Sequence, residues 1–153
     1  MIRKYKEEEI PILLEIWESA ALLAHPFLET EFHEMVKTAM RDMYLPNSDT
    51  WVYEESGIII GFISMAKNEI GGLFVDPKNH SKGVGTALVN HMNNFHDSLE
   101  VEVFKENNIG KPFYIKYGFK IIKAIKIEEK EDINKYKEFS NADIILFDTP
   151  GME

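Results

Sequence analysis

The residues best suited to chemistry lie in one stretch, residues 73–88, where an apolar strand leads through a polar loop into a helix. Gly83 and Gly85 open that helix. The first turn of a helix leaves backbone N–H groups without partners, and the summed peptide dipoles add partial positive charge at the same end. Because glycine has no Cβ, a phosphate can approach this backbone closely. The stretch therefore predicts a pyrophosphate-binding site.

Two common nucleotide-binding patterns do not fit this stretch. A dinucleotide fingerprint needs a third glycine where Leu88 stands, and a Walker-type loop needs Lys and then Ser or Thr directly after its last glycine. Lys78, His80 and Lys82 nevertheless add local positive charge. A Gly-x-Gly pair alone also occurs as plain turn or packing glycines, so a second motif has to decide.

A second motif follows at residues 107–119, which read Asn-Asn-Ile-Gly-Lys-Pro-Phe-Tyr-Ile-Lys-Tyr-Gly-Phe. Together with His-Ser-Lys-Gly-Val-Gly at residues 80–85, it resembles the GNAT superfamily of N-acetyltransferases. The family's cofactor motif is Arg or Gln, two residues, Gly, one residue, and Gly or Ala, so His80 replaces its first residue. The downstream pattern is Asn-x-x-Ala-x-x-Phe-Tyr-x-x-x-Gly-Phe. Gly110 and Pro112 depart from it, and we expect the helix to start late, with Pro112 in its first turn.

The resemblance implies acetyl-coenzyme A as co-substrate. The backbones of Leu73, Phe74 and Val75 would face its pantetheine arm, and the Val75 N–H would polarise the thioester carbonyl. Asn107 would hydrogen-bond the pantetheine, and Phe113 would pack on it. The pyrophosphate would lie against the loop and helix residues His80, Ser81, Lys82, Gly83, Val84, Gly85, Thr86 and Ala87.

Tyr114 matches the family's general acid, which protonates the departing thiolate; otherwise it is a core aromatic beside Phe113. The reaction is the attack of an amine on a thioester carbonyl, so a base must remove a proton from the amine. Glu69, just before the cofactor strand, and His25, between the first two helices, are the candidate bases. Glu69 could instead be a solvated carboxylate at a strand edge, and His25 a structural or exposed loop residue.

The chain contains no cysteine, which excludes an acetyl group carried on an enzyme thiol. We therefore expect direct transfer in a ternary complex, with an amine of a small molecule or a peptide as the acceptor. The alternative from another class is a non-catalytic acyl-coenzyme A-binding regulatory domain. The departures at His80, Gly110 and Pro112 are its only support.

The elements that must position these residues follow from hydrophobic periodicity. Thr30 is the expected N-cap of the second helix, and residues 46–49 are expected to form a turn. Element order and resemblance together predict one domain over residues 1–153, of the α/β (α+β) class, with a mixed, mostly antiparallel central sheet of about seven strands flanked by four helices. The expected strands cover residues 1–5, 50–54, 58–65, 70–75, 99–103, 119–127 and 143–147, and the helices residues 7–24, 30–43, 83–95 and 109–117.

The chain has 26 acidic and 17 basic residues and a formal net charge of −9, which repels nucleic acids and anionic lipid surfaces. We expect no nucleic-acid or membrane partner. No apolar run approaches the roughly 18–20 residues of a membrane span, and the basic start lacks the apolar stretch of a signal peptide, so a cytoplasmic protein is expected. The histidine spacing predicts no metal site, and a homodimer through the late strands is compatible with the pattern.

Overall fold

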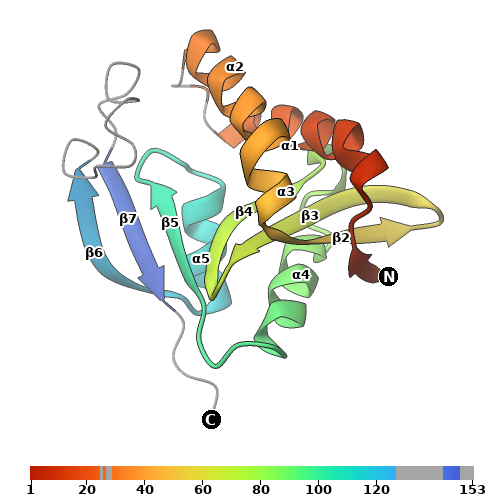
Figure 1. Ribbon diagram of the computed structural model, residues 1–153. Coiled ribbons are helices and arrows are strands. Elements are labelled where there is room, and N and C mark those ends of the chain that lie inside the picture. Colours follow the sequence, from red (N-terminus) through yellow and green to blue (C-terminus); the bar gives the residue numbers. More distant parts are fainter. Residues whose placement is uncertain (25, 27–28, 127–142, 149–153) are drawn as a thin grey trace.

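The computed structural model describes residues 1–24, 26, 29–126 and 143–148, and a single sheet lies at the centre of this part of the chain (Figure 1). Its seven strands follow the order β1-β2-β3-β4-β5-β7-β6. Among the described strand pairs, β4 and β5 are parallel and the others are antiparallel. The predicted sheet is therefore confirmed. The strands are β1 (Ile2–Lys4), β2 (Asp49–Glu55), β3 (Ile58–Ala66), β4 (Glu69–Val75), β5 (Glu100–Phe104), β6 (Lys120–Lys126) and β7 (Asp143–Asp148).

The helices flank the sheet much as the sequence predicts. A 3₁₀ turn (Glu7–Glu9) leads into α1 (Ile10–Ala24), and α4 (Val84–Asn93) and α5 (Gly110–Tyr117) follow later in the chain. In α5, Pro112 does lie in the first turn, and Gly118 follows the last residue with a φ of 123°. A further 3₁₀ turn (Pro77–Asn79) lies between β4 and α4.

The second helical region differs from its prediction in two ways. The N-cap of α2 (Thr30–Ala39) is Glu29 rather than Thr30. The predicted turn at residues 46–49 is also wrong in its first half, because the chain continues through a π-helical turn (Met40–Tyr44) into α3 (Leu45–Asn47). Pro46 is tolerated there because it lies in the first turn of α3, where a missing N–H is least costly.

Two hydrophobic cores form, one on each face of the sheet. Helix α1 covers one face, where Leu13 and Trp17 pack with Phe62 of β3. Helices α4 and α5 cover the other face, where Leu88 packs with Ile63 of β3. Successive residues of a strand point to opposite faces, so the neighbours Phe62 and Ile63, both 0% exposed, belong to different cores. Strand β3 is thus held from both sides and gives β4 a rigid neighbour.

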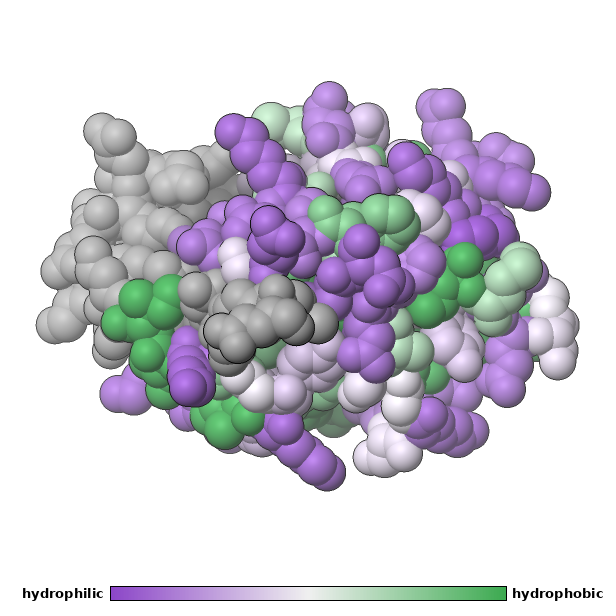
Figure 2. All heavy atoms as spheres, turned by 90° about the horizontal axis from the view of Figure 1, so that it is seen from below, coloured by the Kyte–Doolittle hydropathy of each residue, from purple (hydrophilic) through white to green (hydrophobic). Residues whose placement is uncertain are grey.

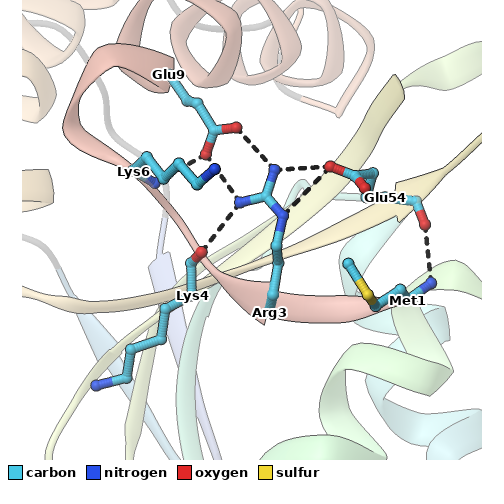
Figure 3. A network of polar contacts seen from close by, with 6 residues as sticks. All are labelled: Met1, Arg3, Lys4, Lys6, Glu9 and Glu54. Atoms are coloured by element: carbon cyan, nitrogen blue, oxygen red, sulfur yellow. Dashed lines mark hydrogen bonds and ion pairs between the residues drawn. The ribbon is translucent and has the colours of Figure 1, made fainter. Parts of the chain in front are cut away.

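An ion-pair network fastens the first strand to the sheet (Figure 3). The guanidinium of Arg3 donates to both carboxylate oxygens of Glu9, at 3.0 and 2.7 Å, and to Glu54 of β2 at 2.7 Å. Glu9 also accepts from the backbone N–H of Lys6 at 2.8 Å, and the N-terminal amine of Met1 donates to the Glu54 carbonyl at 2.8 Å. The bidentate geometry fixes the start of α1 against the edge of the sheet.

The parallel strands β4 and β5 separate soon after they begin. Their pairing is confined to two positions, Glu69 with Glu100 and Ile70 with Val101. The next residue, Gly71, is an extra residue in β4 that has no paired residue on β3. A bulge of this kind bends a strand and increases its twist. The rest of β4 therefore runs beside a gap in the sheet, and this gap positions the candidate site.

One face of the protein is seen in a space-filling view. Seen from below, hydrophilic side chains cover most of the face, and apolar side chains gather in separate patches (Figure 2). The exposed large apolar residues include Ile58, Phe95 and Ile115. Within the described residues, none of the helices has both the length and the apolar character that crossing a membrane requires.

Candidate acyl-coenzyme A site

A cavity of about 1380 Å³ lies at the gap between β4 and β5. Its wall combines the end of β4, the loop that follows, the first turn of α4 and most of α5. Two alanines of α1, Ala20 and Ala24, complete it from the other face of the sheet. The predicted residues among its lining are Leu73, Phe74, Val75, His80, Ser81, Gly83, Val84, Gly85, Thr86, Asn107, Phe113 and Tyr114.

The backbone of β4 offers hydrogen-bonding groups to this cavity. The N–H of Asp76 donates to the opposite carbonyl of Ile60 on β3 at 2.9 Å. Hydrogen-bonded and non-hydrogen-bonded pairs alternate along an antiparallel ladder. Phe74 therefore pairs with β3, whereas the N–H groups of Leu73 and Val75 point toward the gap. Leu73 and Val75 thus have backbone N–H groups available on the side of the gap, and their contact with a pantetheine arm stays a prediction.

Phe74 requires a correction, because its backbone is engaged with β3. Its ring packs on Phe62, with 5.4 Å between the ring centroids, and it covers Gly72. A Cβ at Gly72 would lie 2.5 Å from the Cε2 of Phe74. Phe74 therefore belongs to the cavity as an aromatic wall rather than as a hydrogen-bonding strand residue.

His80 is held by the strand that precedes it. Its Nε2 lies 2.9 Å from the carbonyl oxygen of Val75, so this ring nitrogen carries the proton and donates. The contact joins the loop to the last residue of β4. The sequence predicts a cofactor contact at His80, in the place of an Arg or Gln. The structure adds a positioning contact within the chain.

The N-terminus of α4 lies in the cavity wall. Its N-cap, Gly83, has a φ of 82°, and no side chain caps the first turn. Ser81 also has a positive φ, of 65°. Left-handed residues next to a helix start turn successive N–H groups toward a common point, which is the arrangement of an anion-binding nest.

The two motif glycines are required for different reasons. Gly83 has the left-handed backbone that favours glycine, and a Cβ there would meet no protein atom within 4 Å. A Cβ at Gly85 would lie 3.2 Å from the Cε1 of Phe113. Gly85 therefore also makes room for an aromatic ring of α5, and the expected approach of a phosphate to both glycines stays a prediction.

Asn107 organises the start of α5. Its Oδ1 accepts the N–H groups of Ile109 at 3.1 Å and of Gly110 at 2.7 Å. A Cβ at Gly110 would lie 2.6 Å from the Asn107 Nδ2, so an alanine there would require the Asn107 side chain to shift. These two bonds fix Asn107 at the start of α5, in the wall of the cavity.

Tyr114 lines the cavity and belongs to the core at the same time. It is 6% exposed, and its ring centroid lies 5.1 Å from that of Phe113 and 5.2 Å from that of Phe119. Burial raises the pKa of the Tyr114 hydroxyl well above its ordinary value. The hydroxyl therefore keeps its proton at physiological pH, as a proton donor must.

The cavity differs in charge from the chain as a whole. Of the described residues that line it, none is acidic, and Lys116 and His80 are its basic members. The full sequence carries a net charge of −9. Acidic side chains are thus kept away from this surface, which favours an anionic ligand. The described residues contain no group of three or more His, Cys, Asp or Glu that could hold a metal ion.

Some predicted site residues are not brought to the cavity. Lys82 and Ala87 do not line it; the amine of Lys82 lies 3.4 Å from the Oδ1 of Asn79. Glu69 is at the paired beginning of β4, roughly 20 Å along the strand from Val75 at about 3.3 Å per residue. His25 lies outside the described residues.

A polar network in the cavity wall escaped the sequence analysis. The Tyr117 hydroxyl donates to the Oδ1 of Asn90 and accepts from the Nδ2 of Asn93, each at 2.6 Å. All three residues line the cavity, and the Oδ1 of Asn93 is buried without a hydrogen-bond partner. The α4 part of this network could have been predicted from the sequence. Thr86, Asn90 and Asn93 are spaced four and three residues apart, so they share one face of the helix that begins at the predicted phosphate-binding turn.

Comparison with known proteins identifies the class of protein that has this fold, these separated parallel strands and this uncapped helix start. Residues 2–134 match the family described as acetyltransferase (GNAT) domain, so the chain belongs to the GNAT acetyltransferases. It is an acyltransferase, an N-acetyltransferase that uses an acyl-coenzyme A and an amine acceptor. The non-catalytic regulatory domain considered as the alternative is not favoured.

Two relatives from Escherichia coli (strain K12) cover most of the chain. One is the peptidyl-lysine N-acetyltransferase YiaC, 34% identical over 123 residues, which are 80% of this chain and 84% of that protein. The other is the peptidyl-lysine N-acetyltransferase YjaB, 30% identical over 129 residues, which are 84% of this chain and 87% of that protein.

Solved structures agree with this assignment. The solution structure of apo-form YjaB from Escherichia coli superposes with a TM-score of 0.83 at 27% identity and covers 99% of this chain and 98% of that one. The PaiA N-acetyltransferase from Thermoplasma acidophilum, solved in complex with coenzyme A, shares the fold with a TM-score of 0.72 at 18% identity, covering 95% of this chain and 96% of that one.

Proposed function

We propose that this protein transfers an acetyl group from acetyl-coenzyme A to the side-chain amine of a lysine in a peptide or protein, directly and within a ternary complex. The observation that carries the proposal is the cavity at the gap between β4 and β5, whose wall holds an uncapped helix start and no acidic residue among the described lining. The lysine acceptor is supported by the relatives YiaC and YjaB, both peptidyl-lysine N-acetyltransferases.

In this proposal the N-terminus of α4 binds the diphosphate. The N–H groups around Gly83 and Gly85 supply hydrogen bonds and the positive end of the helix dipole. The pantetheine lies along β4, where Leu73 and Val75 point their N–H groups toward the gap. Phe113 packs beside the arm, and Asn107 forms a hydrogen bond with it.

Acetyl-coenzyme A supplies a thioester carbonyl that an amine can attack. The Val75 N–H polarises that carbonyl and stabilises the charge that develops on its oxygen. As the new C–N bond forms and the C–S bond breaks, the Tyr114 hydroxyl gives its proton to the departing sulfur. The absence of cysteine leaves no enzyme thiol to carry the acetyl group, which supports direct transfer.

The base that takes the amine proton stays a prediction. Glu69 lies roughly 20 Å along β4 from Val75, beyond the reach of a direct or single-water proton transfer at the thioester, so this candidate would need a longer chain of waters. His25, the second candidate, follows directly after Ala24, an α1 residue of the cavity wall. Loss of the acidic limb from the pH–rate profile in Glu69→Gln or His25→Ala would identify the group, because a general base works only in its deprotonated form.

The test uses two peptides that differ in one side chain. A lysine peptide with a blocked N-terminus and the same peptide with norleucine are each incubated with the protein and acetyl-coenzyme A. We expect the release of free thiol and a mass gain of one acetyl group with the lysine peptide only. Free thiol without a mass gain, or no turnover with either peptide, would contradict the proposal.

A further inference from the structure

A second, smaller cavity of about 270 Å³ lies between α1 and α2. It shares no lining residue with the coenzyme cavity. On α1 it is lined by Glu18 and Leu22, whereas Ala20 and Ala24 line the coenzyme cavity. Residues two apart on a helix point about 200° from each other, so the cavities lie on opposite sides of α1. The full lining is Trp17, Glu18, Leu22, Pro26, Thr30, His33, Glu34 and Lys37.

A buried histidine without partners lies in the wall of this second cavity. His33 is 8% exposed, and neither Nδ1 nor Nε2 has a hydrogen-bond partner. A neutral imidazole offers one donor and one acceptor, and leaving buried polar atoms without hydrogen-bond partners destabilises a fold. Such an atom in a native protein calls for a ligand or water. The cavity beside the ring is large enough for several waters or a short alkyl chain with a polar head.

The charges around the cavity favour a cation. The Lys37 amine lies 2.8 Å from the Glu18 carboxylate, so these two groups offset each other across the two helices. Glu34 then gives the lining one negative charge in excess. The ring of Trp17, 5.9 Å from that of His33, is a surface on which a cation or its alkyl chain packs well.

We propose that this second cavity is a binding site for a small protonated primary amine, separate from the site of acetyl transfer. The ammonium donates to the acceptor nitrogen of His33 and to the Glu34 carboxylate, and its alkyl chain packs on Trp17 and Leu22. The same chemistry fits a free alkylamine and the lysine side chain of a bound protein. The site rests on the lining of the second cavity, so it stands independently of the proposed acetyl acceptor.

The experiment titrates the ¹⁵N-labelled full chain with n-butylammonium and follows the indole N–H signal of Trp17. The chain has two tryptophans, so Trp51→Phe assigns that signal. Tetramethylammonium, which has the charge but no N–H, and n-butanol, which has the chain but no charge, are the matched probes. We expect a saturable shift with n-butylammonium and a markedly weaker response to the other two. Equal affinity for tetramethylammonium would show binding by charge alone, and no shift with n-butylammonium would show a cavity that holds water only; either result would overturn the proposal.

Two substitutions on the surface of α2 localise the site. Glu34→Gln should weaken n-butylammonium binding by about fivefold, the upper range for an exposed charge pair. Glu31→Gln, which removes the same charge from the same helix outside the cavity, should leave it unchanged. Equal affinities in the two variants would contradict the proposal, because an amine bound in the coenzyme cavity would not respond to Glu34.

A peptide pair separates the two sources of the amine. A lysine peptide that shifts the Trp17 signal where its norleucine counterpart does not would assign the site to a side chain of a protein. A response to n-butylammonium without a response to the peptide would assign it to a free amine.

Discussion

The ring of Phe113 in α5 lies on the backbone of Gly85 in the first turn of α4, so closely that a Cβ at Gly85 would stand 3.2 Å from the Cε1 of the ring. The contact joins the two motifs of the coenzyme site, which are 28 positions apart in the sequence. The two glycines therefore have different roles: Gly85 leaves room for the Phe113 ring, whereas Gly83 adopts a positive φ. The start of α4 and the aromatic wall are therefore one unit.

This relationship predicts that the glycines fail differently on substitution. Gly85→Ala pushes the Phe113 ring into the cavity and should weaken acetyl-coenzyme A binding by about fivefold, the equivalent of about 1 kcal/mol of overpacking.

Gly83→Ala should lower the free energy of unfolding by about 1 kcal/mol, because alanine is strained at a positive φ. Gly83→Asn should lose less. Calorimetric binding and chemical unfolding measure both, and an unchanged affinity in Gly85→Ala would contradict the packing role.

Tyr114→Phe tests the general acid. The ring packing stays while the hydroxyl is lost, so we expect about a 10²-fold lower kcat with unchanged binding of coenzyme A. Burial raises the pKa of Tyr114, so its proton is retained through and beyond the ordinary tyrosine pKa of about 10. The pH–rate profile of the variant should therefore keep its shape below pH 10, with a lower kcat at every pH. Wild-type turnover in Tyr114→Phe would remove the hydroxyl from the reaction.

Tyr117→Phe is the matched control, since it removes the hydroxyl of the second tyrosine in the cavity wall. Its hydrogen bonds to Asn90 and Asn93 join α4 to α5. We expect a loss of about 1 kcal/mol in the free energy of unfolding and little change in kcat. A fall in kcat as large as that of Tyr114→Phe would assign the proton donor to the wrong tyrosine.

The fold could be predicted from the sequence largely because its signals are local. Gly118 marks the end of α5 and Pro112 its first turn, and alternating apolar residues mark the strands. The errors arose where neighbouring structure overrides a local signal. Pro46 looks like a turn residue, but the π-helical turn before it carries the chain into α3.

The site was predictable in its glycine motif and aromatic pair but not in its partners. Nothing in the residue type of His80 reveals that its ring donates to the Val75 carbonyl, because that bond depends on how the loop folds back. The pairing of Phe74 with β3 depends on the ladder register, which the sequence does not state. The network around Tyr117 requires α4 and α5 to be packed together.

The hydrogen bond between His80 and Val75 can be tested by a rescue. His80→Ala removes the donor, and we expect the KM for acetyl-coenzyme A to rise by about fivefold as the loop before α4 loses its anchor. His80→Gln retains an N–H that can reach the same carbonyl, so it should restore most of the affinity. If Gln were no better than Ala, the histidine would act by contact with the coenzyme and not by positioning the loop.

The Arg3 network predicts a dependence of stability on pH. Hydrogen bonds from Arg3 lower the pKa of Glu9 in the folded protein. A carboxylate with a lowered pKa stabilises the fold at neutral pH, and this contribution is lost as the pH falls below its ordinary pKa of about 4.5. Glu9→Gln should cost about 1 kcal/mol at pH 7 and progressively less toward pH 4. Glu8→Gln, in the same turn, should have no such effect; equal losses would contradict the account.

The central claim is that the backbone at the start of α4 binds a diphosphate. A ¹⁵N titration that follows the amide signals of Gly83 and Gly85 tests it most directly, with coenzyme A as ligand and acetyl-pantetheine as the matched ligand that lacks the phosphates. We predict large, saturable shifts of both amides with coenzyme A and small ones with acetyl-pantetheine. Saturable coenzyme A binding that leaves both amide signals in place would contradict the claim.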